Sequence, residues 1–560
     1  MINYICKYTP IDIVQFLGDT PLKIEPSVNG FDKADALMHP NMCTYSKAAL
    51  EYILNSGLKN LILMNCCDSI KRLYDVLKET GNFNFLYIMD IPRKNNREAH
   101  EMMKNELYKF IHTYEVCFSK TFDETAFKKY MLIHENENEK ISARGIKIAL
   151  LGARCKPSVK KLIEDCGAHI AHDYTCTGKR RLYSKLSKDE DIMSWYAQNL
   201  LNQFPCMRMT NINKRSDTFR HFNDISGIIY HTVKFCDNYS FEYASLKNKS
   251  NIPILKIETD YTDQCEGQIR TRVEAFIESI KKSAAVPFKK DNKSQVIPHG
   301  IITAGIDSGS TSTNVVIMDD KKNMLSSSIV RTGSRSIDSA HKAFDEALSK
   351  ARLKKEDINF IVSTGYGRVN IPFADLNVTE ITCHGKGAFF IDKDIRTIID
   401  IGGQDSKVIR LDESGNVTDF AMNDKCAAGT GRFLEMMART LEIPLDSMGD
   451  ESKGWKEEIA ITSICTVFAE SEVVSLVAQN KNKSDIIHGL NNCIAGKTIG
   501  LLDRVGRKSK YMMSGGVAKN SGVVRSLEEK LGEKIYIYDE PEIIGALGAA
   551  LIALEKTIPL

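Results

Sequence analysis

The sequence predicts an α/β protein made of two halves, and three observations support this. Short apolar runs alternate with amphipathic segments in both halves, which is typical of parallel sheets covered by helices. Loops of small residues recur between apolar runs in the second half, which indicates an internal duplication. A polar stretch with two prolines and no helical period runs from about residue 283 to 300. We therefore expect an N-terminal domain over residues 1–285, a linker over 286–299 and a C-terminal domain over 300–560.

The N-terminal half is expected to contain two Rossmann-like subdomains, each with a parallel sheet. Residues 61–64 form an apolar strand that is followed by Cys66, Cys67 and an amphipathic helix. After a polar stretch at 134–140, a second unit begins with a strand at 146–151 and continues with a helix and another strand. Because ligand groups gather at the carboxyl ends of parallel strands, cysteines at such ends are candidate ligands.

The C-terminal half is expected to bind a nucleotide. Three loops rich in small residues, at 307–313, 402–406 and 514–518, each follow an apolar strand. Backbone N–H groups in such loops converge on anions, and paired glycines permit the close approach of a base or ribose. One such loop alone is more often a plain turn, but three in this order favour a nucleotide site. Its candidate catalytic residues, for holding Mg²⁺ and orienting water, are Asp307, Gln404 and Asp405.

Composition excludes several classes of protein. Of the 560 residues, 43% are hydrophobic and 26% are charged, as in an ordinary globular protein. The net charge of +3 is too small to favour nucleic acid or an anionic membrane as a partner. No apolar run reaches the ~18 residues of a membrane span, and the N-terminus lacks the pattern of a signal peptide. We expect a cytoplasmic protein.

The chain contains 15 cysteines, and this odd, high count without a signal peptide argues against a disulfide framework. Cys426 and Cys465 lie in the predicted nucleotide domain, where hydrolysis has no use for thiolates, whereas iron–sulfur clusters are held by thiolates. Packing of both residues in the core is the alternative. A zinc site is a further alternative in the first half, although zinc favours CxxC spacing, which does not occur in this chain.

Motifs of the C-terminal half resemble those of a known family. The segments GIDSGSTSTN, STGYGR, DIGGQDSK, NDKCAAGTGRF, CTVFAESEV and MSGGVAKN are similar to those of the ATP-dependent activators of 2-hydroxyacyl-CoA dehydratases and of benzoyl-CoA reductase ATPase subunits. This resemblance covers about residues 300–556 and implies the duplicated α/β ATPase fold of actin, Hsp70 and sugar kinases. It implies that ATP or ADP with Mg²⁺ is bound by Gly309, Ser310, Thr311, Gly402, Gly403, Gly515 and Gly516, together with the three candidate catalytic residues.

The same resemblance implies that Cys426 and Cys465 ligate a [4Fe–4S] cluster that bridges two chains of a homodimer. Cys493 lies on or beside an apolar helix face, and Cys383 lacks a ligand-like setting, so both are expected to have packing roles. Two thiolates per chain around a two-fold axis would then supply the four that a cluster usually needs.

The N-terminal half resembles the catalytic subunits of the same systems over about residues 4–282. The matching segments are KYTP, HPNMC, NCCD, DYTCTG, VKFC and GQIRTRVEAF. In dehydratases, each such subunit holds one [4Fe–4S] cluster by three cysteines. This chain departs from that pattern because six cysteines stand in motif-like settings: Cys43, Cys66, Cys67, Cys176, Cys206 and Cys236.

Six thiolates match the double-cubane cluster proteins, in which two cubanes are joined as an [8Fe–9S] cluster; a single [4Fe–4S] cluster stays the alternative. No cluster role is expected for Cys6, Cys117, Cys166 or Cys265, and Cys155 is undecided.

The two resemblances together imply a fusion that transfers low-potential electrons with ATP hydrolysis, as an oxidoreductase of anaerobic metabolism acting on a small-molecule substrate. A ferredoxin or flavodoxin is the expected electron donor. One alternative is an (R)-2-hydroxyacyl-CoA dehydratase component joined to its activator. A second alternative, from another class, is a non-redox kinase or chaperone-like ATPase.

Overall fold

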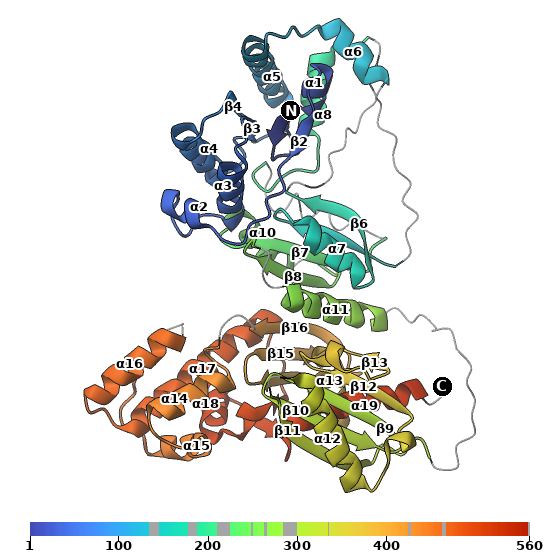
Figure 1. Ribbon diagram of the computed structural model, residues 1–560, viewed down its shortest axis with the longest axis vertical. Helices are drawn as coiled ribbons and strands as arrows, with labels where there is room; N and C mark the ends of the chain where they lie inside the picture. Colours follow the sequence, from blue (N-terminus) through green and yellow to red (C-terminus); the bar gives the residue numbers. More distant parts are fainter. Residues whose placement is uncertain are drawn as a thin grey trace. The chain divides into compact units, whose positions relative to one another are not determined.

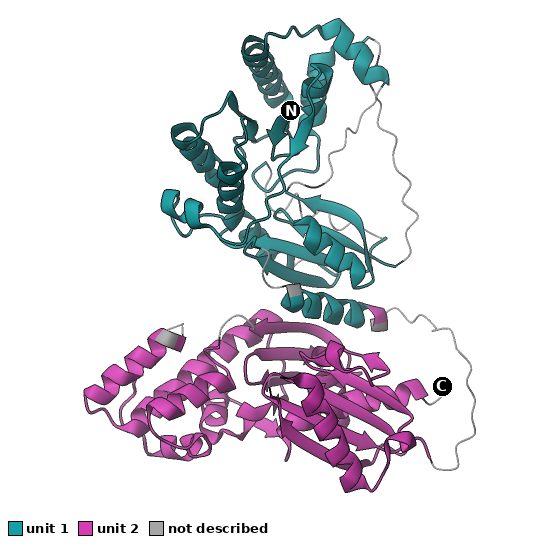
Figure 2. Cartoon of the chain, in the orientation of Figure 1, with its two compact units in different colours: residues 1–280 teal, residues 281–560 magenta. Residues whose placement is uncertain are grey.

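The computed structural model describes most of the chain, namely residues 1–133, 145–176, 178, 186–187, 189–209, 215, 224–247, 250–262, 266–283, 300–333, 335–423, 427–461 and 466–557. The chain divides into two compact units, Met1–Ile280 and Lys281–Leu560, which Figure 2 colours separately. Among the described residues, no helix is long and apolar enough to span a bilayer.

The first sheet of unit 1 has four parallel strands in the order β2-β1-β3-β4. They are β1 (Ile2–Tyr4), β2 (Pro21–Lys23), β3 (Asn60–Met64) and β4 (Phe85–Met89). Strand β3 reads as one continuous apolar run because it is buried on both faces. One face is covered by α1 (Ile11–Phe16), α5 (Arg97–Phe118), α6 (Glu124–Ile133) and α8 (Ile192–Leu201), and the other by α2 (Asp32–Leu37), α3 (Thr44–Ser56) and α4 (Asp68–Thr80) (Figure 1).

The second sheet of unit 1 is also parallel, in the order β6-β5-β7-β8. Its strands are β5 (Ile146–Gly152), β6 (Ala168–Thr175), β7 (Gly227–Val233) and β8 (Ile254–Thr259), with helices α7 (Pro157–Asp165), α10 (Asp237–Lys247) and α11 (Glu266–Ser283). Leu61 and Leu63 of the first sheet share a core with Ala149 and Leu151 of the second. The prediction of two parallel-sheet subdomains is confirmed.

Unit 2 contains the same five-stranded topology twice, which confirms the predicted duplication. The first sheet has the order β11-β10-β9-β12-β13 and the second has the order β16-β15-β14-β17-β18. In each, the first three strands in sequence are antiparallel and the last two pair in parallel. The strands are β9 (Thr303–Ser308), β10 (Ser312–Met318), β11 (Met324–Arg331), β12 (Phe360–Thr364) and β13 (Leu376–Asn377), then β14 (Thr397–Ile401), β15 (Ser406–Leu411), β16 (Val417–Asn423), β17 (Tyr511–Ser514) and β18 (Ile535–Ile537).

Eight α-helices among the described residues complete unit 2: α12 (Ser336–Ala351), α13 (Glu380–Ile391), α14 (Gly431–Thr440), α15 (Met448–Glu451), α16 (Thr466–Ala478), α17 (Lys483–Val505), α18 (Ser521–Leu531) and α19 (Ile544–Thr557). Helix α19 packs directly on β9, because a Cβ atom at Gly305 would lie only 2.0 Å from the Ala546 carbonyl oxygen. This close packing also brings α13 and α19 beside the end of β9, where Asp307 lies.

Candidate functional site

Two loops meet in unit 2, one from each half of the duplication. The first connects β9 to β10, and the second connects β14 to β15. The second loop is closed by a hydrogen bond from the Gly402 N–H to the Asp405 carbonyl oxygen (3.0 Å). A Cβ atom at Gly403 would lie 1.7 Å from Thr311 Oγ1, so the two loop tips are in contact and only glycine fits there.

Asp307 lies at the base of these loops, near the end of β9, and is only 7% exposed. Two glycines leave room for its carboxylate, because a Cβ atom at Gly365 would lie 2.4 Å from Oδ1 and one at Gly545 would lie 2.2 Å from Oδ2. Burial raises the pKa of Asp307 to about 6, although the neighbouring His384 opposes this. A carboxylate so enclosed is suited to a hard cation such as Mg²⁺.

Several oxygens around Asp307 lack a hydrogen-bond partner among the described residues. These buried atoms are Ser308 Oγ, Thr311 Oγ1, Thr364 Oγ1 and Glu380 Oε2. Thr364 is the register partner of Asp307 across β12 and β9. Buried polar atoms are normally paired, so a cluster of unpaired ones fits a polar ligand such as Mg²⁺ with its waters or the oxygens of a phosphate.

A buried network of charges, which the sequence did not predict, lies beside Asp307. Lys407 Nζ lies 2.8 Å from Asp405, 3.2 Å from Asp400 and 3.6 Å from Glu380, measured to carboxylate oxygens. His384 Nε2 lies 3.3 Å from Asp400 Oδ1, and its Nδ1 lies 2.9 Å from the Glu380 carbonyl oxygen. Burial lowers the pKa of His384, but Asp400 outweighs it and raises that pKa to about 9.

The third small-residue loop follows β17. Gly515 has a φ of +81°, and a Cβ atom there would lie 2.5 Å from the Ile401 carbonyl oxygen, so the loop lies against the end of β14. Nothing lies within 4 Å of a Cβ atom at Gly516, which leaves open space over the loop. Gln404 is exposed at the tip of the second loop. The sequence-derived nucleotide residues therefore gather at one edge of the two sheets.

Cys426 and Cys465 lie outside the described residues, so their ligand role stays a prediction. The described chain resumes as helix α16 at Thr466, and α14 begins at Gly431, whose N–H donates to the Gly402 carbonyl oxygen (2.9 Å). Three apolar side chains of α16 are exposed: Phe468 (68%), Val474 (53%) and Val477 (41%).

Seven thiols gather in unit 1, around the carboxyl ends of strands from both sheets. They belong to Cys6, Cys43, Cys66, Cys67, Cys176, Cys206 and Cys236. Six of them are the predicted cluster ligands, and the seventh, Cys6, was expected to have no such role. The structure thus places Cys6 beside the predicted ligands, which the sequence did not lead us to expect, and its ligand role stays untested.

Cys43 and Cys236 form one pair within this group. Cys43 immediately precedes α3, and the next residue, Thr44, donates from its N–H to the Lys234 carbonyl oxygen (3.1 Å) in the loop after β7. A hydrogen bond between the two thiols lowers the pKa of Cys43 and raises that of Cys236. Thr44 thus ties together two segments that are almost 200 residues apart.

Cys6, Cys66 and Cys67 form a second contact series at the ends of the paired strands β1 and β3. The Cys66 thiol is hydrogen-bonded to both of its neighbours, which lowers the pKa of Cys67 and brings that of Cys6 to about 7. Cys176 donates from its N–H to the Gly152 carbonyl oxygen (2.8 Å) at the end of β5. Burial raises the pKa of the Cys176 thiol.

The remaining described cysteines lie elsewhere. Cys117 is exposed, Cys166 is half-buried at the end of α7, and the buried Cys155 contacts the Lys156 carbonyl oxygen (3.8 Å). Cys383 is fully buried in α13, and Cys493 is half-buried against the core. Within the described residues, no three His, Cys, Asp or Glu side chains are placed to hold a single metal ion. The thiolates around an iron–sulfur cubane lie farther apart than the ligands of a single metal ion. The absence of a single-ion site therefore does not conflict with a cluster bound by the seven thiols.

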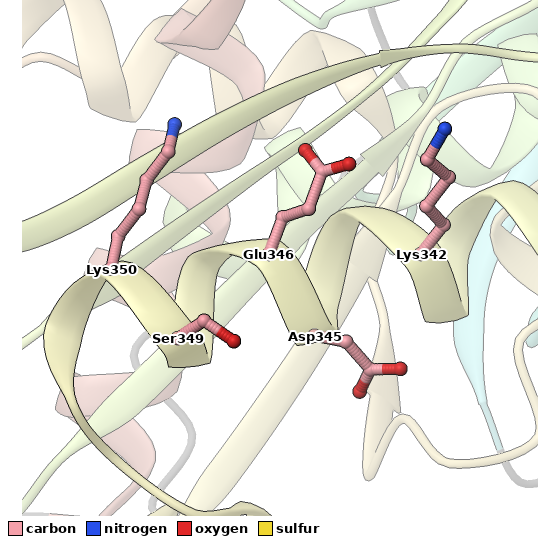
Figure 3. A pocket seen from close by; sticks show the side chains of 5 residues that line it. All are labelled: Lys342, Asp345, Glu346, Ser349 and Lys350. Carbon is pink, nitrogen blue, oxygen red and sulfur yellow. The ribbon is translucent and has the colours of Figure 1, made fainter.

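A shallow pocket on unit 2 is distinct from both groups of residues. It is lined by Lys342, Asp345, Glu346, Ser349 and Lys350, all of helix α12. Figure 3 shows Lys342, Glu346 and Lys350 on one side of the helix and the other two side chains on the opposite side. None of the residues gathered around Asp307 lines it, so we assign it no role.

Comparisons with known proteins separate the two halves of the chain. Residues 304–553 match the model of the BadF/BadG/BcrA/BcrD ATPase family, and residues 6–143 and 132–280 match that of the 2-hydroxyglutaryl-CoA dehydratase D-component. The activator of lactoyl-CoA dehydratase from Anaerotignum propionicum is 47% identical over 253 residues, which cover 45% of this chain and 97% of that protein.

Two further relatives match a similar share of the chain. The (R)-2-hydroxyglutaryl-CoA dehydratase activating ATPase of Acidaminococcus fermentans is 46% identical over 257 residues, or 46% of this chain and 98% of that protein. A benzoyl-CoA reductase subunit of Thauera aromatica is 33% identical over 260 residues, or 45% of this chain and 92% of that protein.

Proposed function

Since the chain belongs to the BadF/BadG/BcrA/BcrD ATPase family and its other half matches a dehydratase component, we propose that it couples ATP hydrolysis to low-potential electron transfer within one polypeptide. Unit 2 hydrolyses ATP and donates the electron, and unit 1 receives it and reduces a small molecule. The gathering of seven thiols in unit 1 carries this proposal, because an ATPase alone has no use for them.

The residues of unit 2 fit Mg²⁺ and a nucleotide. Asp307 supplies a carboxylate to the metal, and the unpaired hydroxyl groups of Thr311 and Thr364 supply polar contacts. Gln404 is exposed at a loop tip, where an amide can orient the attacking water. Lys407 holds Asp405 and Asp400 in place, so the second loop is fixed before the nucleotide arrives.

The donor set of unit 1 fits iron and sulfide. Thiolates are the ordinary ligands of iron–sulfur clusters, and the seven thiols outnumber the three needed for one open cubane. When bound, such a cluster takes up and passes on single electrons. The protein contributes the thiolates, a buried surrounding that excludes water, and the positive charge of Lys7, which is 6% exposed. These features support an [8Fe–9S] double cubane over a single [4Fe–4S] cluster.

We propose further that two copies of the chain share one [4Fe–4S] cluster through Cys426 and Cys465, with a ferredoxin or flavodoxin as donor and the cytoplasm as compartment. The exposed Val474 and Val477, which are neighbours one turn apart on α16, support a dimer, because adjacent apolar side chains at a surface favour a partner surface. Helix α16, which bears them, begins directly after Cys465, so the proposed interface and the shared cluster lie together in the sequence.

A second candidate is a dehydratase component joined to its activator. The match of residues 6–280 to the dehydratase D-component favours it. It needs one open cubane, for which Cys43, Cys67 and Cys236 suffice. Iron analysis separates the two candidates, because a double cubane adds about eight irons per chain in unit 1 and an open cubane about four.

The test of the proposed function uses the whole chain, purified without oxygen. Dithionite-reduced ferredoxin is added with ATP, with ADP or alone, and reduction of the unit 1 cluster is followed by electron paramagnetic resonance. We expect reduction with ATP only. A colourless protein, or equal reduction in all three samples, would show a non-redox kinase or chaperone-like ATPase or an uncoupled carrier instead.

A further inference from the structure

Building on the proposed function, we propose that Cys6 is a thiolate ligand of the second N-terminal cubane, together with Cys176 and Cys206, and that Lys7 provides the counter-charge of this cubane. Cys6 has no place in the six-cysteine set that the motifs predict. The structure places it among these thiols through contacts that no sequence motif spans.

Three hydrogen bonds tie the segment around Cys6 to the segment around Cys206. Lys7 Nζ donates to the Phe204 carbonyl oxygen (2.7 Å), and Gln203 Nε2 donates to the Lys7 carbonyl oxygen (3.4 Å). The Cys206 N–H donates to the hydroxyl oxygen of Tyr8 (3.3 Å). Two segments about 200 residues apart are thus joined, and both cysteines are buried, with exposed fractions of 6% and 8%.

Cys176 joins the same group through an aromatic contact. The rings of Tyr174 and Phe204 lie 4.3 Å apart between centroids, two residues before Cys176 and two before Cys206. The thiol of Cys176 interacts electrostatically most strongly with that of Cys206, then with those of Cys6 and Cys67. Three thiols from separate segments therefore surround one region, as one cubane with three protein ligands requires.

The other thiols form a second, adjoining set. Cys43 and Cys236 are in contact, and Cys67 interacts more strongly with Cys43 than with Cys6. Weaker interactions, such as that of Cys236 with Cys176, join this set to the first. Cys66 lies between the two sets, since its thiol contacts both Cys6 and Cys67. Seven thiols are thus available for the six positions of a double cubane, and the side chain of Lys7 indicates which set Cys6 joins.

Lys7 is a buried lysine with no carboxylate counter-charge in the described part of the chain. No described carboxylate lies within ion-pair distance of its Nζ, whereas the nearby Arg215 is paired with Glu242. A buried ammonium is costly without a counter-charge. Its acidic neighbours are the thiols of Cys176, Cys206 and Cys6, so an anionic cluster held by these three supplies the missing charge.

The experiment measures iron and sulfide in the whole chain after anaerobic reconstitution. We expect Cys6→Ser and Cys176→Ser each to lose the same portion, about four irons per chain. Cys155→Ser is the matched control, because Cys155 is also buried (3% exposed) but contacts a backbone carbonyl group rather than another thiol, and it should keep full iron content. Retention of all iron by Cys6→Ser would overturn the assignment.

Lys7→Met provides a second measurement that does not depend on losing a ligand. We expect it to keep its iron and to shift the reduction potential of the unit 1 cluster to more negative values, because a positive charge favours the reduced form; Lys7→Arg should restore most of the shift. An unchanged potential in Lys7→Met would remove Lys7 from the site. If only Cys43, Cys67 and Cys236 variants lose iron while ATP-dependent reduction persists, this inference fails and the proposed function stands.

Discussion

Replacement of Lys407 by Met should destabilise unit 2 strongly. Lys407 is 5% exposed, and its ammonium faces Asp405, Asp400 and Glu380 at 2.8, 3.2 and 3.6 Å. Met has a similar length and leaves no large cavity, so the substitution mainly removes the charge. Three carboxylates would then be left with His384 as the only remaining cation that the described residues place in contact with Asp400.

The magnitude follows from the burial of the network. Removing one partner of a buried ion pair costs about 3–5 kcal/mol, because the other charge stays buried without compensation. In a unit of this size, 1 kcal/mol shifts the Tm by about 2–4 °C. We therefore expect Lys407→Met to lower the Tm of unit 2 by roughly 6–20 °C.

Differential scanning calorimetry of the whole chain measures this change. The transition of unit 2 is identified in the wild type as the one that ADP moves to higher temperature, since a ligand that binds only the folded state stabilises it. Lys386→Met is the matched control, because Lys386 pairs with Glu555 at the surface, with side chains 33% and 53% exposed. Such pairs contribute at most about 1 kcal/mol. Equal shifts in the two variants would refute the reasoning.

Three further predictions concern the same unit. Asp307→Ala should abolish ATP hydrolysis while iron content stays that of the wild type; undiminished turnover would exclude Asp307 from the metal site. His384 should stabilise the fold fully below pH ~6.5, its ordinary pKa, and lose this contribution as the pH rises through about 9, on the order of 3 kcal/mol in all. In urea titrations from pH 6 to 10, His384→Asn should therefore flatten the decline of stability, and an identical decline would contradict the assignment. Cys465→Ser should lose the shared cluster and shift the dimer towards monomer in analytical ultracentrifugation, whereas Cys493→Ser should retain both; a stable dimer in the first variant would separate assembly from the cluster.

Local patterns were sufficient to predict the sheets and the loops. The apolar run at 61–64 is strand β3, and the duplication inferred from small-residue loops appears as two sheets of identical order. These features depend on neighbours in sequence, which is why periodicity and glycine content reveal them. The order of strands within each sheet could not be predicted from local patterns, because strand pairing joins residues far apart in the chain.

The site residues that the sequence did not predict also depend on contacts between distant parts of the chain. Cys6 follows an apolar strand and has no metal-ligand spacing, and it reaches Cys66 only because β1 and β3 pair in parallel. Glu380 and His384 are four residues apart and lie on one face of α13, but this spacing alone does not indicate a buried ion-pair network. The third member of that network, Lys407, comes from a separate strand, so its role could not be read from sequence.

One electrostatic rule distinguishes the two sites. In unit 2 the buried cations His384 and Lys407 have carboxylate partners within the chain, so that network is complete before any ligand binds, and its loss should appear as lost stability. In the described part of unit 1, the acidic neighbours of the buried Lys7 are thiols rather than carboxylates. Its charge is balanced only once the thiols act as thiolates around a cluster, so its loss should appear first in the reduction potential. Replacement of lysine by methionine is therefore expected to lower the Tm in unit 2 but to shift the reduction potential in unit 1. Measuring the Tm and the reduction potential of both Lys407→Met and Lys7→Met tests whether Lys7 belongs to a cofactor site or to the fold.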